Sequence, residues 1–181
     1  MWHNNLLNNL VQKITPFLWF DKEAEEAINF YVSIFSDWPA KKAESKIVSI
    51  KRYPNGPLEG PMKGMEGKVL TAVFELEGER FMALDGGPFF KPTGAVSLYV
   101  ECNTQEEVDY FWQKFSEDAN LNAQQCGWLL DKYGFSWQII PTALPKLLND
   151  QDKEKSARVM QAMLKMKKID IKKLEEALEQ R

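Results

Sequence analysis

The sequence of 181 residues is poor in the residue types that build several classes of site. It holds a single histidine, His3, and two cysteines, Cys102 and Cys126. Two cysteines are too few for a disulfide framework, and reduced thiols indicate a cytoplasmic protein. A formal net charge of −3 gives no reason to expect a nucleic-acid or anionic-membrane partner. No apolar run approaches the roughly 20 residues of a membrane span, and the first residues lack the pattern of a signal peptide.

What the sequence does contain is a segment that occurs twice. Residues 14–35, ITPFLWFDKEAEEAINFYVSIF, align without a gap with residues 94–115, GAVSLYVECNTQEEVDYFWQKF, at an offset of 80. Each copy reads as a short apolar strand, a polar break and a helix with one apolar face. The buried positions expected in the two helices are Ile28, Tyr31, Val32, Phe35, Val108, Phe111, Trp112 and Phe115. Asp21 is the expected cap of the first helix, and Thr104 with Glu107 forms a capping box for the second.

Strand patterns follow each predicted helix. The predicted strands of the first half are residues 46–53, 68–76 and 80–84, and those of the second half are residues 126–131 and 136–140. A turn at Glu77 and Gly78 joins the last two strands of the first half into a hairpin. The strand that would directly follow the second helix is the least defined element, because residues 117–125 are polar. We predict an α+β fold of two β-α-β-β-β modules.

The predicted domain boundaries follow the repeat. Residues 1–13 form an N-terminal extension, residues 14–87 the first module, residues 95–141 the second module and residues 142–181 a C-terminal helical segment. Within that last segment the spacing predicts a short helix at 144–148 and a final helix capped by Asp170. Between them it predicts an amphipathic helix marked by Ala157, Met160, Met163 and Leu164.

Several segments resemble a known family. The repeated segment, the stretch CGWLLDKYGFSWQIIP from Cys126 and the tail MLKMKKIDIKKLEEAL resemble the PhnB-like branch of the vicinal-oxygen-chelate superfamily. That superfamily includes glyoxalase and bleomycin-resistance proteins, and members of this branch are often labelled 3-demethylubiquinone-9 3-methyltransferase domains. The resemblance extends from Ile14 to the C-terminus. It implies a cupped mixed sheet in each module, a pocket between the modules and a homodimer.

The superfamily's chemistry usually rests on a divalent metal held by histidine and glutamate side chains. The DxxGxxxE pattern that supplies one ligand corresponds here to Asp131, Gly134 and Gln138, so an amide stands where the family has an acid. Aligning the closing hairpins of the two modules at an offset of 56 sets Met82 against Gln138, and a thioether is a poor ligand for a hard cation. We therefore predict that the metal site is lost and that the protein uses no cofactor.

The candidate ligand pocket consists of aromatic and small polar side chains. Its predicted members are Trp19, Met82, Asp85, Tyr99, Cys126, Trp128, Ser136 and Gln138. Gln138 either orients a ligand carbonyl or is a satisfied buried amide, and Asp85 either lines the pocket mouth or belongs to a turn. Cys126 is more simply explained as a small buried hydrophobe than as a reactive thiol. Alternation along the strands places Phe81 and Trp137 against helices, on the face opposite Gln138.

Three functions are compatible with these residues. The favoured hypothesis is metal-independent binding of a small apolar or aromatic metabolite between the modules. The second is an enzyme, either the methyltransferase of the family label or a divalent-metal glyoxalase- or dioxygenase-type enzyme. The third is a dimeric scaffold with a vestigial pocket. S-adenosylmethionine usually binds at a glycine-rich turn between a strand and a helix, and no such pattern surrounds Gly64, Gly67 or Gly86.

Overall fold

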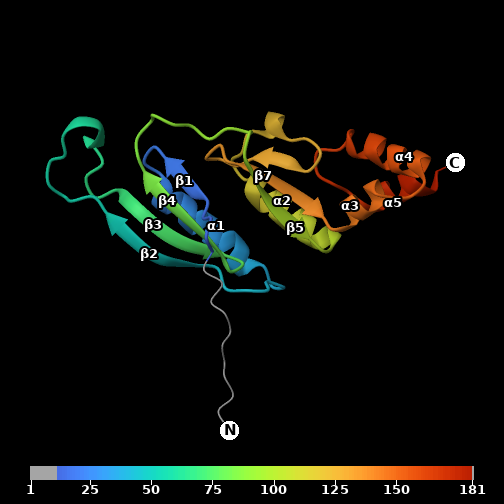
Figure 1. Cartoon of the computed structure of the whole chain (residues 1–181), viewed down its shortest axis with the longest axis horizontal. Coiled ribbons are helices and arrows are strands. Elements are labelled where there is room, and N and C mark those ends of the chain that lie inside the picture. Colours follow the sequence, from blue (N-terminus) through green and yellow to red (C-terminus); the bar gives the residue numbers. More distant parts are fainter. Residues whose placement is uncertain (1–11, 181) are drawn as a thin grey trace, which may run out of the picture. The chain divides into compact units, whose positions relative to one another are not determined.

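The computed structural model describes residues 12–180, whose contacts divide the chain into two compact units (Figure 1). The first unit ends at Phe90 and the second begins at Lys91. Each unit contains one β-sheet with a helix packed against it, which confirms the predicted α+β class. In the part of the chain described, no helix has the length and apolarity needed to cross a bilayer.

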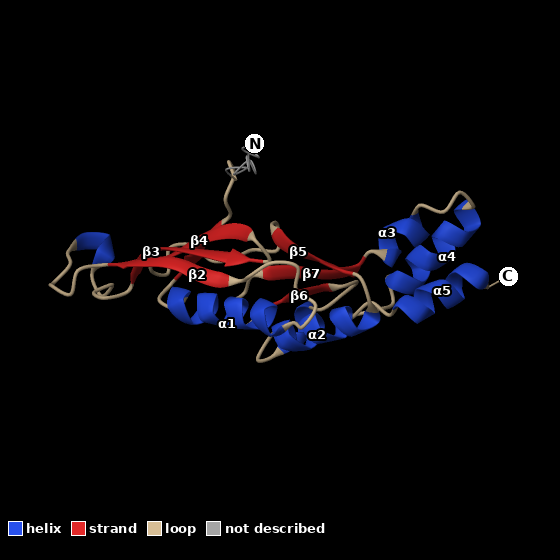
Figure 2. Ribbon diagram, turned by 90° about the horizontal axis from the view of Figure 1, so that it is seen from below, coloured by secondary structure: helices blue, strands red, loops and turns tan. Residues whose placement is uncertain are grey.

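The first unit has the predicted β-α-β-β-β order. Its elements are β1 (Phe17–Phe20), α1 (Ala24–Asp37), β2 (Lys46–Arg52), a short 3₁₀ helix η1 (Gly60–Met62), β3 (Val69–Leu76) and β4 (Glu79–Asp85). The sheet order is β1-β4-β3-β2, with β1 parallel to β4 and the other pairs antiparallel. The predicted hairpin turn is present: Glu77 and Gly78 both have positive φ and join β3 to β4. Figure 2 shows α1 along one face of this sheet.

Helix α1 buries the apolar stripe that its spacing predicts. Ile28, Tyr31 and Phe35 are buried, whereas Val32 is half-buried. On the sheet the facing positions are small or aromatic: Ala72, Phe74 and Ala83 are fully buried. This packing fixes which face of the sheet is covered by the helix and which is left open.

The start of α1 is capped by a residue that is distant in the sequence. The carboxylate of Asp85, at the end of β4, accepts hydrogen bonds from the backbone N–H groups of Ala24 at 2.8 Å and Val69 at 2.9 Å. Glu23 occupies the N-cap position and makes no side-chain cap bond. The prediction that Asp21 caps this helix is therefore wrong, because the helix begins at Ala24 and its N–H group is bound by Asp85.

The second unit contains a shorter version of the same module. Its elements are β5 (Ser97–Cys102), α2 (Gln105–Ser116), a short 3₁₀ helix η2 (Leu121–Ala123), β6 (Trp128–Leu130) and β7 (Ser136–Pro141). The sheet order is β5-β7-β6, with β5 parallel to β7 and β6 antiparallel to it. Residues 117–125 carry η2 where the module repeat would place a further strand. Their polar sequence lacks the alternation that one buried sheet face requires.

The sequence repeat is also a structural repeat. Leu18 of β1 pairs with Ala83 in the parallel ladder, and Leu98 of β5 pairs with Trp137 in the corresponding ladder. Both ladder partners are buried on the helix side of their sheet. The offset of 80 therefore relates equivalent positions of the two modules.

Most of the features predicted for helix α2 are confirmed. Thr104 caps it by accepting a hydrogen bond from the backbone N–H of Glu107, whose carboxylate accepts from the N–H of Asn103. The reciprocal bond thus reaches one residue beyond that of a standard capping box. Of the predicted stripe, Val108, Phe111 and Phe115 are buried and Trp112 is half-buried.

The C-terminal segment forms three helices that pack against one another beyond the end of β7. They are α3 (Ala143–Leu148), α4 (Lys153–Met163) and α5 (Ile171–Glu179), and the last is capped by Asp170 as predicted. Their core consists of Ile140, Leu144, Val159, Ile169 and Leu174. Backbone N–H groups of Cys126 and Gly127 donate to the carbonyls of Met166 and Lys167, at 2.8 and 2.7 Å. These bonds attach the segment directly to the start of β6.

Candidate functional site

Three predicted pocket residues form a row across the second sheet. Gln138 of β7 pairs directly with Tyr99 of β5 on one side and with Trp128 of β6 on the other. Directly paired residues point to the same face of a sheet. That face is opposite to the one covered by α2, because Trp137 stacks on Phe115 with ring centroids 4.1 Å apart. Tyr99 is 50% exposed and Trp128 37% exposed, so the row lies on an accessible surface of this unit.

The amide of Gln138 is held by a serine that the sequence-based set did not include. Gln138 Nε2 lies 2.7 Å from Ser97 Oγ, on β5, and donates a hydrogen bond to it. The second N–H and the carbonyl oxygen of this amide make no hydrogen bond to the residues that the structure describes. Ser136, predicted to share the face of Gln138, pairs with Ser97 and is buried. The amide is thus oriented and retains both a donor and an acceptor for a ligand.

The charges around this row favour a neutral ligand. Burial, followed by the negative charge of Glu101, raises the pKa of Tyr99 above its usual value, so its phenol stays protonated at neutral pH. Glu101 lies two residues beyond Tyr99 on the same strand and therefore on the same face. A carboxylate in this position disfavours anionic ligands, and the row itself contains no cationic side chain.

The C-terminal segment bounds one side of the face. Ile140 lies two residues beyond Gln138 on β7, and it is buried in the core that α3, α4 and α5 form. Cys126, also predicted for the pocket, precedes β6 and faces the tail, because its thiol donates to the Met163 carbonyl at 3.5 Å. The structure therefore places Cys126 and Ile140 against the helical segment, beside the row of Tyr99, Gln138 and Trp128.

In the first module, the residue equivalent to Tyr99 is engaged by its own chain. Trp19 is the repeat equivalent of Tyr99, and its indole N–H donates to the Gly87 carbonyl at 2.9 Å. Phe90 meets the Trp19 ring edge-on at a centroid distance of 4.9 Å. Gly86 lies so close to this ring that no Cβ would fit between them. Trp19 is thus an anchor for residues 86–90, whereas the equivalent Tyr99 is open.

The strand register corrects the predicted counterpart of Gln138. Trp19 pairs with Leu84 in the first module, and Tyr99 pairs with Gln138 in the second. Leu84 is therefore the counterpart of Gln138, and Met82 corresponds to Ser136. The closing hairpins differ in length, since the residue pairs Leu76–Glu79 and Leu130–Ser136 enclose loops of different size. Aligning the turn glycines therefore misplaces the counterpart of Gln138 by two residues along β4. Met82 and Leu84 point to the same face of the sheet, so the predicted face is right and the predicted counterpart is wrong.

The predicted pocket residue Asp85 has a structural place in the first unit. It is 1% exposed, and both of its oxygens accept the backbone hydrogen bonds described above. Loss of hydration raises its pKa above the usual value, although the donors from Ala24 and Val69 oppose this shift. Asp131 of the second unit is similarly engaged: it accepts from the N–H groups of Tyr133 and Phe135 and from the Trp137 indole.

Comparison with known proteins assigns the family. Residues 12–140 match the family described as 3-demethylubiquinone-9 3-methyltransferase. The PhnB protein of Bacillus cereus is 44% identical, with a TM-score of 0.58, over 70% of this chain and 97% of that one. The chain belongs to this PhnB-like family. Protein PA1353 of Pseudomonas aeruginosa, 17% identical over 68% of this chain and 92% of that one, shares the fold with a TM-score of 0.52. No match is found among curated proteins.

The PhnB-like branch belongs to a superfamily in which a metal is common, but the donors on this face do not fit one. Gln138, Ser97 and Tyr99 offer amide and hydroxyl oxygens, whereas a transition metal requires imidazole, thiolate or carboxylate ligands. The nearest motif acid, Asp131, is bonded to backbone and indole N–H groups. Across residues 12–180, no three His, Cys, Asp or Glu side chains are grouped so that they could hold an ion.

The glycines also do not fit the methyl donor that the family description implies. Gly64 and Gly67 lead into strand β3, and Gly86 and Gly87 continue along β1, donating to the carbonyls of Phe20 and Asp21. Neither pair opens a helix, so the described residues do not form the glycine-rich strand-to-helix turn that S-adenosylmethionine usually requires.

Two residues of the site were missed from the sequence, Ser97 and Glu101. Both lie two positions from Tyr99, and the two-residue period of a strand would have placed them on its face. The alternation of the strand was therefore the signal that could have found them. Ser97 was not singled out, because a serine hydroxyl is a poor ligand for a transition metal.

Proposed function

We propose that the second module binds a small neutral ring compound on the face formed by Tyr99, Gln138 and Trp128, without a metal ion. The observation that carries the proposal is the row itself: one oriented amide stands between two exposed aromatic side chains. Adjacent strands lie about 4.8 Å apart, so the row spans roughly 10 Å, which suits one or two fused rings. The physiological role of this binding would be carriage, sequestration or a mild acid–base step.

The chemistry of the row supports a ring that carries a carbonyl or a phenol. The free N–H of the Gln138 amide can donate to a carbonyl, and its oxygen can accept from a hydroxyl. Tyr99 and Trp128 supply aromatic surface on either side. Phosphate and carboxylate ligands are disfavoured by Glu101 and by the lack of an arginine on the row.

Binding of a defined probe tests this proposal. Neutral phenols and quinones would be screened by thermal shift, with 4-hydroxyacetophenone as the reference probe for calorimetry. Gln138→Leu should weaken its binding by about 1–3 kcal/mol, because one buried polar group of the ligand loses its partner. Gln113→Leu, at an exposed position of α2, is the matched control and should leave the affinity unchanged. Equal affinity in wild type and Gln138→Leu would refute the assignment of the site.

The family description favours methyl transfer as a second candidate. S-adenosylmethionine therefore belongs in the same thermal-shift screen, where the proposal expects no stabilisation. A saturable rise of the unfolding temperature with S-adenosylmethionine would contradict the ring-binding proposal and favour the enzyme hypothesis. Elemental analysis of tag-free protein should likewise find no stoichiometric Zn, Fe or Ni, and one equivalent of any of them would contradict metal independence.

We also propose a cytoplasmic location. Cys102 and Cys126 are both free thiols, and Cys102 is buried, which raises its pKa and keeps it protonated. Unpaired cysteines are typical of a reducing compartment. Fractionation of the native source would check this, with recovery in a secreted or periplasmic fraction as the contrary result.

A further inference from the structure

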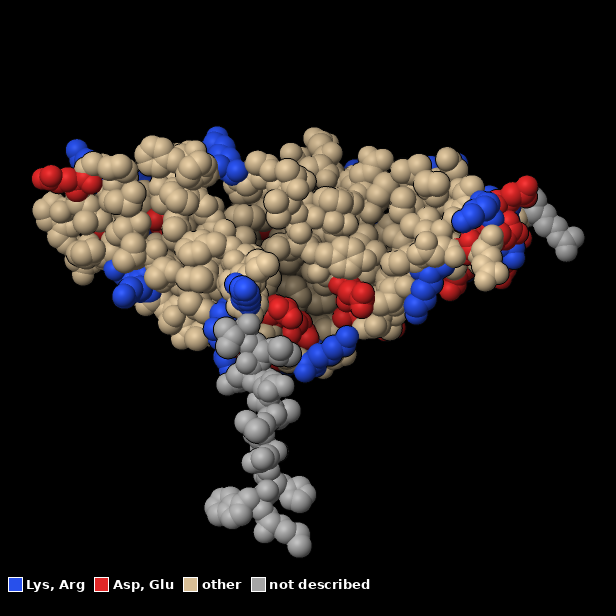
Figure 3. All heavy atoms as spheres, in the orientation of Figure 1, with Lys and Arg blue, Asp and Glu red and all other residues tan. Residues whose placement is uncertain are grey.

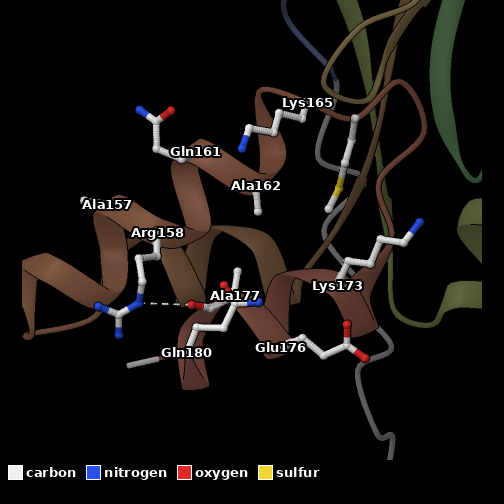
Figure 4. Close-up of a pocket in the computed structure, with 10 residues that line it drawn as sticks. Ala157, Arg158, Gln161, Ala162, Lys165, Lys173, Glu176, Ala177 and Gln180 are labelled. Carbon is white, nitrogen blue, oxygen red and sulfur yellow. Dashed lines mark hydrogen bonds between the residues drawn. The ribbon is translucent and has the colours of Figure 1, made fainter.

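A groove lies between α4 and α5, in the helical segment that follows the second module. It has a volume of about 600 Å³, and every residue that lines it lies beyond residue 140, where the family match ends. Its floor consists of Arg158, Ala162, Met166 and Ala177, which are buried or half-buried (Figure 4). A cavity of this size accommodates a small molecule. None of the residues on the ring-binding face contributes to this groove.

The middle of the groove is apolar. In Figure 4 the methyl groups of Ala162 and Ala177 lie between the two helices. Met166, which follows the end of α4, extends this apolar surface. The side chains of these three residues contain no strong hydrogen-bonding group, and the two alanines leave space above the floor. This part of the groove therefore suits the methylene groups of a ligand.

The charged side chains on the α5 side of the groove have partners of opposite charge. Lys173 pairs with Asp170 at 3.3 Å, and Glu176 pairs with Lys172 at 3.8 Å. Figure 3 shows acidic and basic side chains close together at this end of the chain. These two pairs cancel, so α5 adds little net charge to the groove.

The two remaining charged residues of the lining, Arg158 and Lys165, are cations on the α4 side. Lys165 makes no ion pair with any residue in the described part of the chain. The Nε and Nη2 groups of Arg158 donate to the carbonyls of Ala177 and Leu178, at 3.2 and 3.1 Å, and one of these bonds is drawn in Figure 4. These bonds orient the guanidinium, whose Nη1 donates to none of the described residues. Both positive charges therefore lack an anionic partner.

The spacing of the two cations sets the length of a matching ligand. Arg158 and Lys165 are seven residues apart, which is close to two helical turns, so both lie on one side of α4 about 10 Å apart along its axis. Lys165 continues the helix by a tightened turn, since its N–H donates to the Ala162 carbonyl at 3.1 Å. Side chains of a helix tilt towards its N-terminus, so the spacing of the backbone is kept by the charges.

We propose that this groove binds a straight-chain dicarboxylate of about eight carbons. One carboxylate lies beside Arg158, the other beside Lys165, and the methylene chain lies on Ala162 and Ala177. In the extended form, seven C–C bonds of about 1.5 Å span roughly 9 Å, which matches the spacing of the cations. Hydrogen bonds between ionised partners are the strong ones, and a carboxylate suits the planar donors of arginine.

Titration of the ¹⁵N-labelled full chain with suberate, at constant ionic strength, tests this proposal by nuclear magnetic resonance. The backbone amide signals of Ala162 and Ala177 should move and saturate. Lys165→Gln should weaken suberate binding about threefold to tenfold, because one partly exposed ion pair is lost. Lys153→Gln is the matched control: it removes one exposed positive charge from the same helix, outside the groove, and should bind suberate like wild type.

Two further ligands separate charge from length. Octanoate has the same number of carbons but one carboxylate, and succinate has two carboxylates that are too close together to reach both cations. Both should bind more weakly than suberate. Octanoate binding as tightly as suberate would make the groove a site for monocarboxylates and overturn the proposal. Succinate binding as tightly as suberate would show that the spacing of the cations is not read.

Three other results would also overturn the proposal. Suberate that moves neither the Ala162 nor the Ala177 signal does not bind in the groove. Equal suberate affinity of wild type and Lys165→Gln would remove Lys165 from the site. An equal loss in Lys165→Gln and Lys153→Gln would show general attraction to a basic helix. The ring-binding face is tested separately with 4-hydroxyacetophenone, so failure of either proposal leaves the other open to its own test.

Discussion

At the scale of single residues, two buried aspartates accept hydrogen bonds from groups of the protein itself, and their oxygens are not directed at a ligand. Asp85 joins the start of α1 to the start of β3, and Asp131 joins its own loop to the indole of Trp137. Both terminate strands, where an acid is often interpreted as part of a site. Their hydrogen bonds show that Asp85 holds the scaffold of the first module and that Asp131 holds the scaffold of the second.

The role of Asp85 predicts a loss of stability on neutralisation. Asp85→Asn replaces one acceptor oxygen by an NH₂ group, so either Ala24 or Val69 loses its hydrogen bond. The free energy of unfolding should fall by about 1–3 kcal/mol, measured by urea denaturation at neutral pH. Asp21→Asn is the control, because Asp21 caps no helix, and it should cost clearly less. The reverse order of the two effects would restore Asp21 as the cap.

The packing of Trp19 on Gly86 gives a second residue-scale prediction. In Gly86→Ala the added Cβ would run into the indole ring, which must then give up its bond to Gly87. Overpacking of this kind typically costs about 1–3 kcal/mol. Gly56→Ala is the control, because a Cβ added there would meet no atom within 4 Å and the φ of Gly56 is ordinary. Equal urea midpoints for the two variants would show that residues 86–90 do not pack on Trp19.

At the scale of elements, the first turn of α2 holds the segment that leads into α5. The Gln105 amide donates to the Ile169 carbonyl and accepts from the Ile171 N–H, and it also donates to Asp109. Asp109 in turn pairs with Lys168. Partial burial opposes ionisation of Asp109, but the hydrogen bonds from Lys168 and Gln105 hold its pKa below the usual value. The helical segment is thereby fixed to the second module.

The lowered pKa of Asp109 sets the sign of a pH dependence. Its stabilising contribution is present above the unfolded-state pKa of about 3.9 and is lost as pH falls through the lower folded-state value. Asp109→Asn should therefore be less stable than wild type at neutral pH, and the difference should vanish in acid. Thermal unfolding followed by circular dichroism over this range measures it, with the exposed Asp37→Asn as control. A difference that persists unchanged in strong acid would exclude the ion pair as its cause.

At the scale of the whole molecule, the sequence predicted most elements because they repeat and have clear periods. Both helices, the first-module strands and the Asp170 cap follow from local patterns. The cap from Asp85 could not be predicted, because it joins residues that lie far apart in the chain. The counterpart of Gln138 was missed because the two hairpin loops differ in length. Aligning the turn glycines of the two hairpins therefore does not align the residues that pair in the two sheets. The Ser97 contact depends on the same register.

The N-terminal extension, residues 1–13, was predicted as a separate segment, and its first eleven residues lie outside the described part of the chain. The predicted pocket residues of the first module make different contacts from those of the second. Trp19 and Asp85 are engaged by their own module, whereas Tyr99, Trp128 and Gln138 share one open row. This asymmetry between two copies of one unit is the reason for assigning ligand binding to the second module.

The most direct measurement of that claim is the nuclear magnetic resonance spectrum of ¹⁵N-labelled protein during addition of 4-hydroxyacetophenone. We predict that the indole signal of Trp128 and the side-chain amide signal of Gln138 move together and saturate. The indole signal of Trp137, on the helix-covered face, should stay in place. Movement of Trp137 or of first-module signals, with Trp128 and Gln138 unchanged at saturation, would contradict ligand binding on the row of the second module.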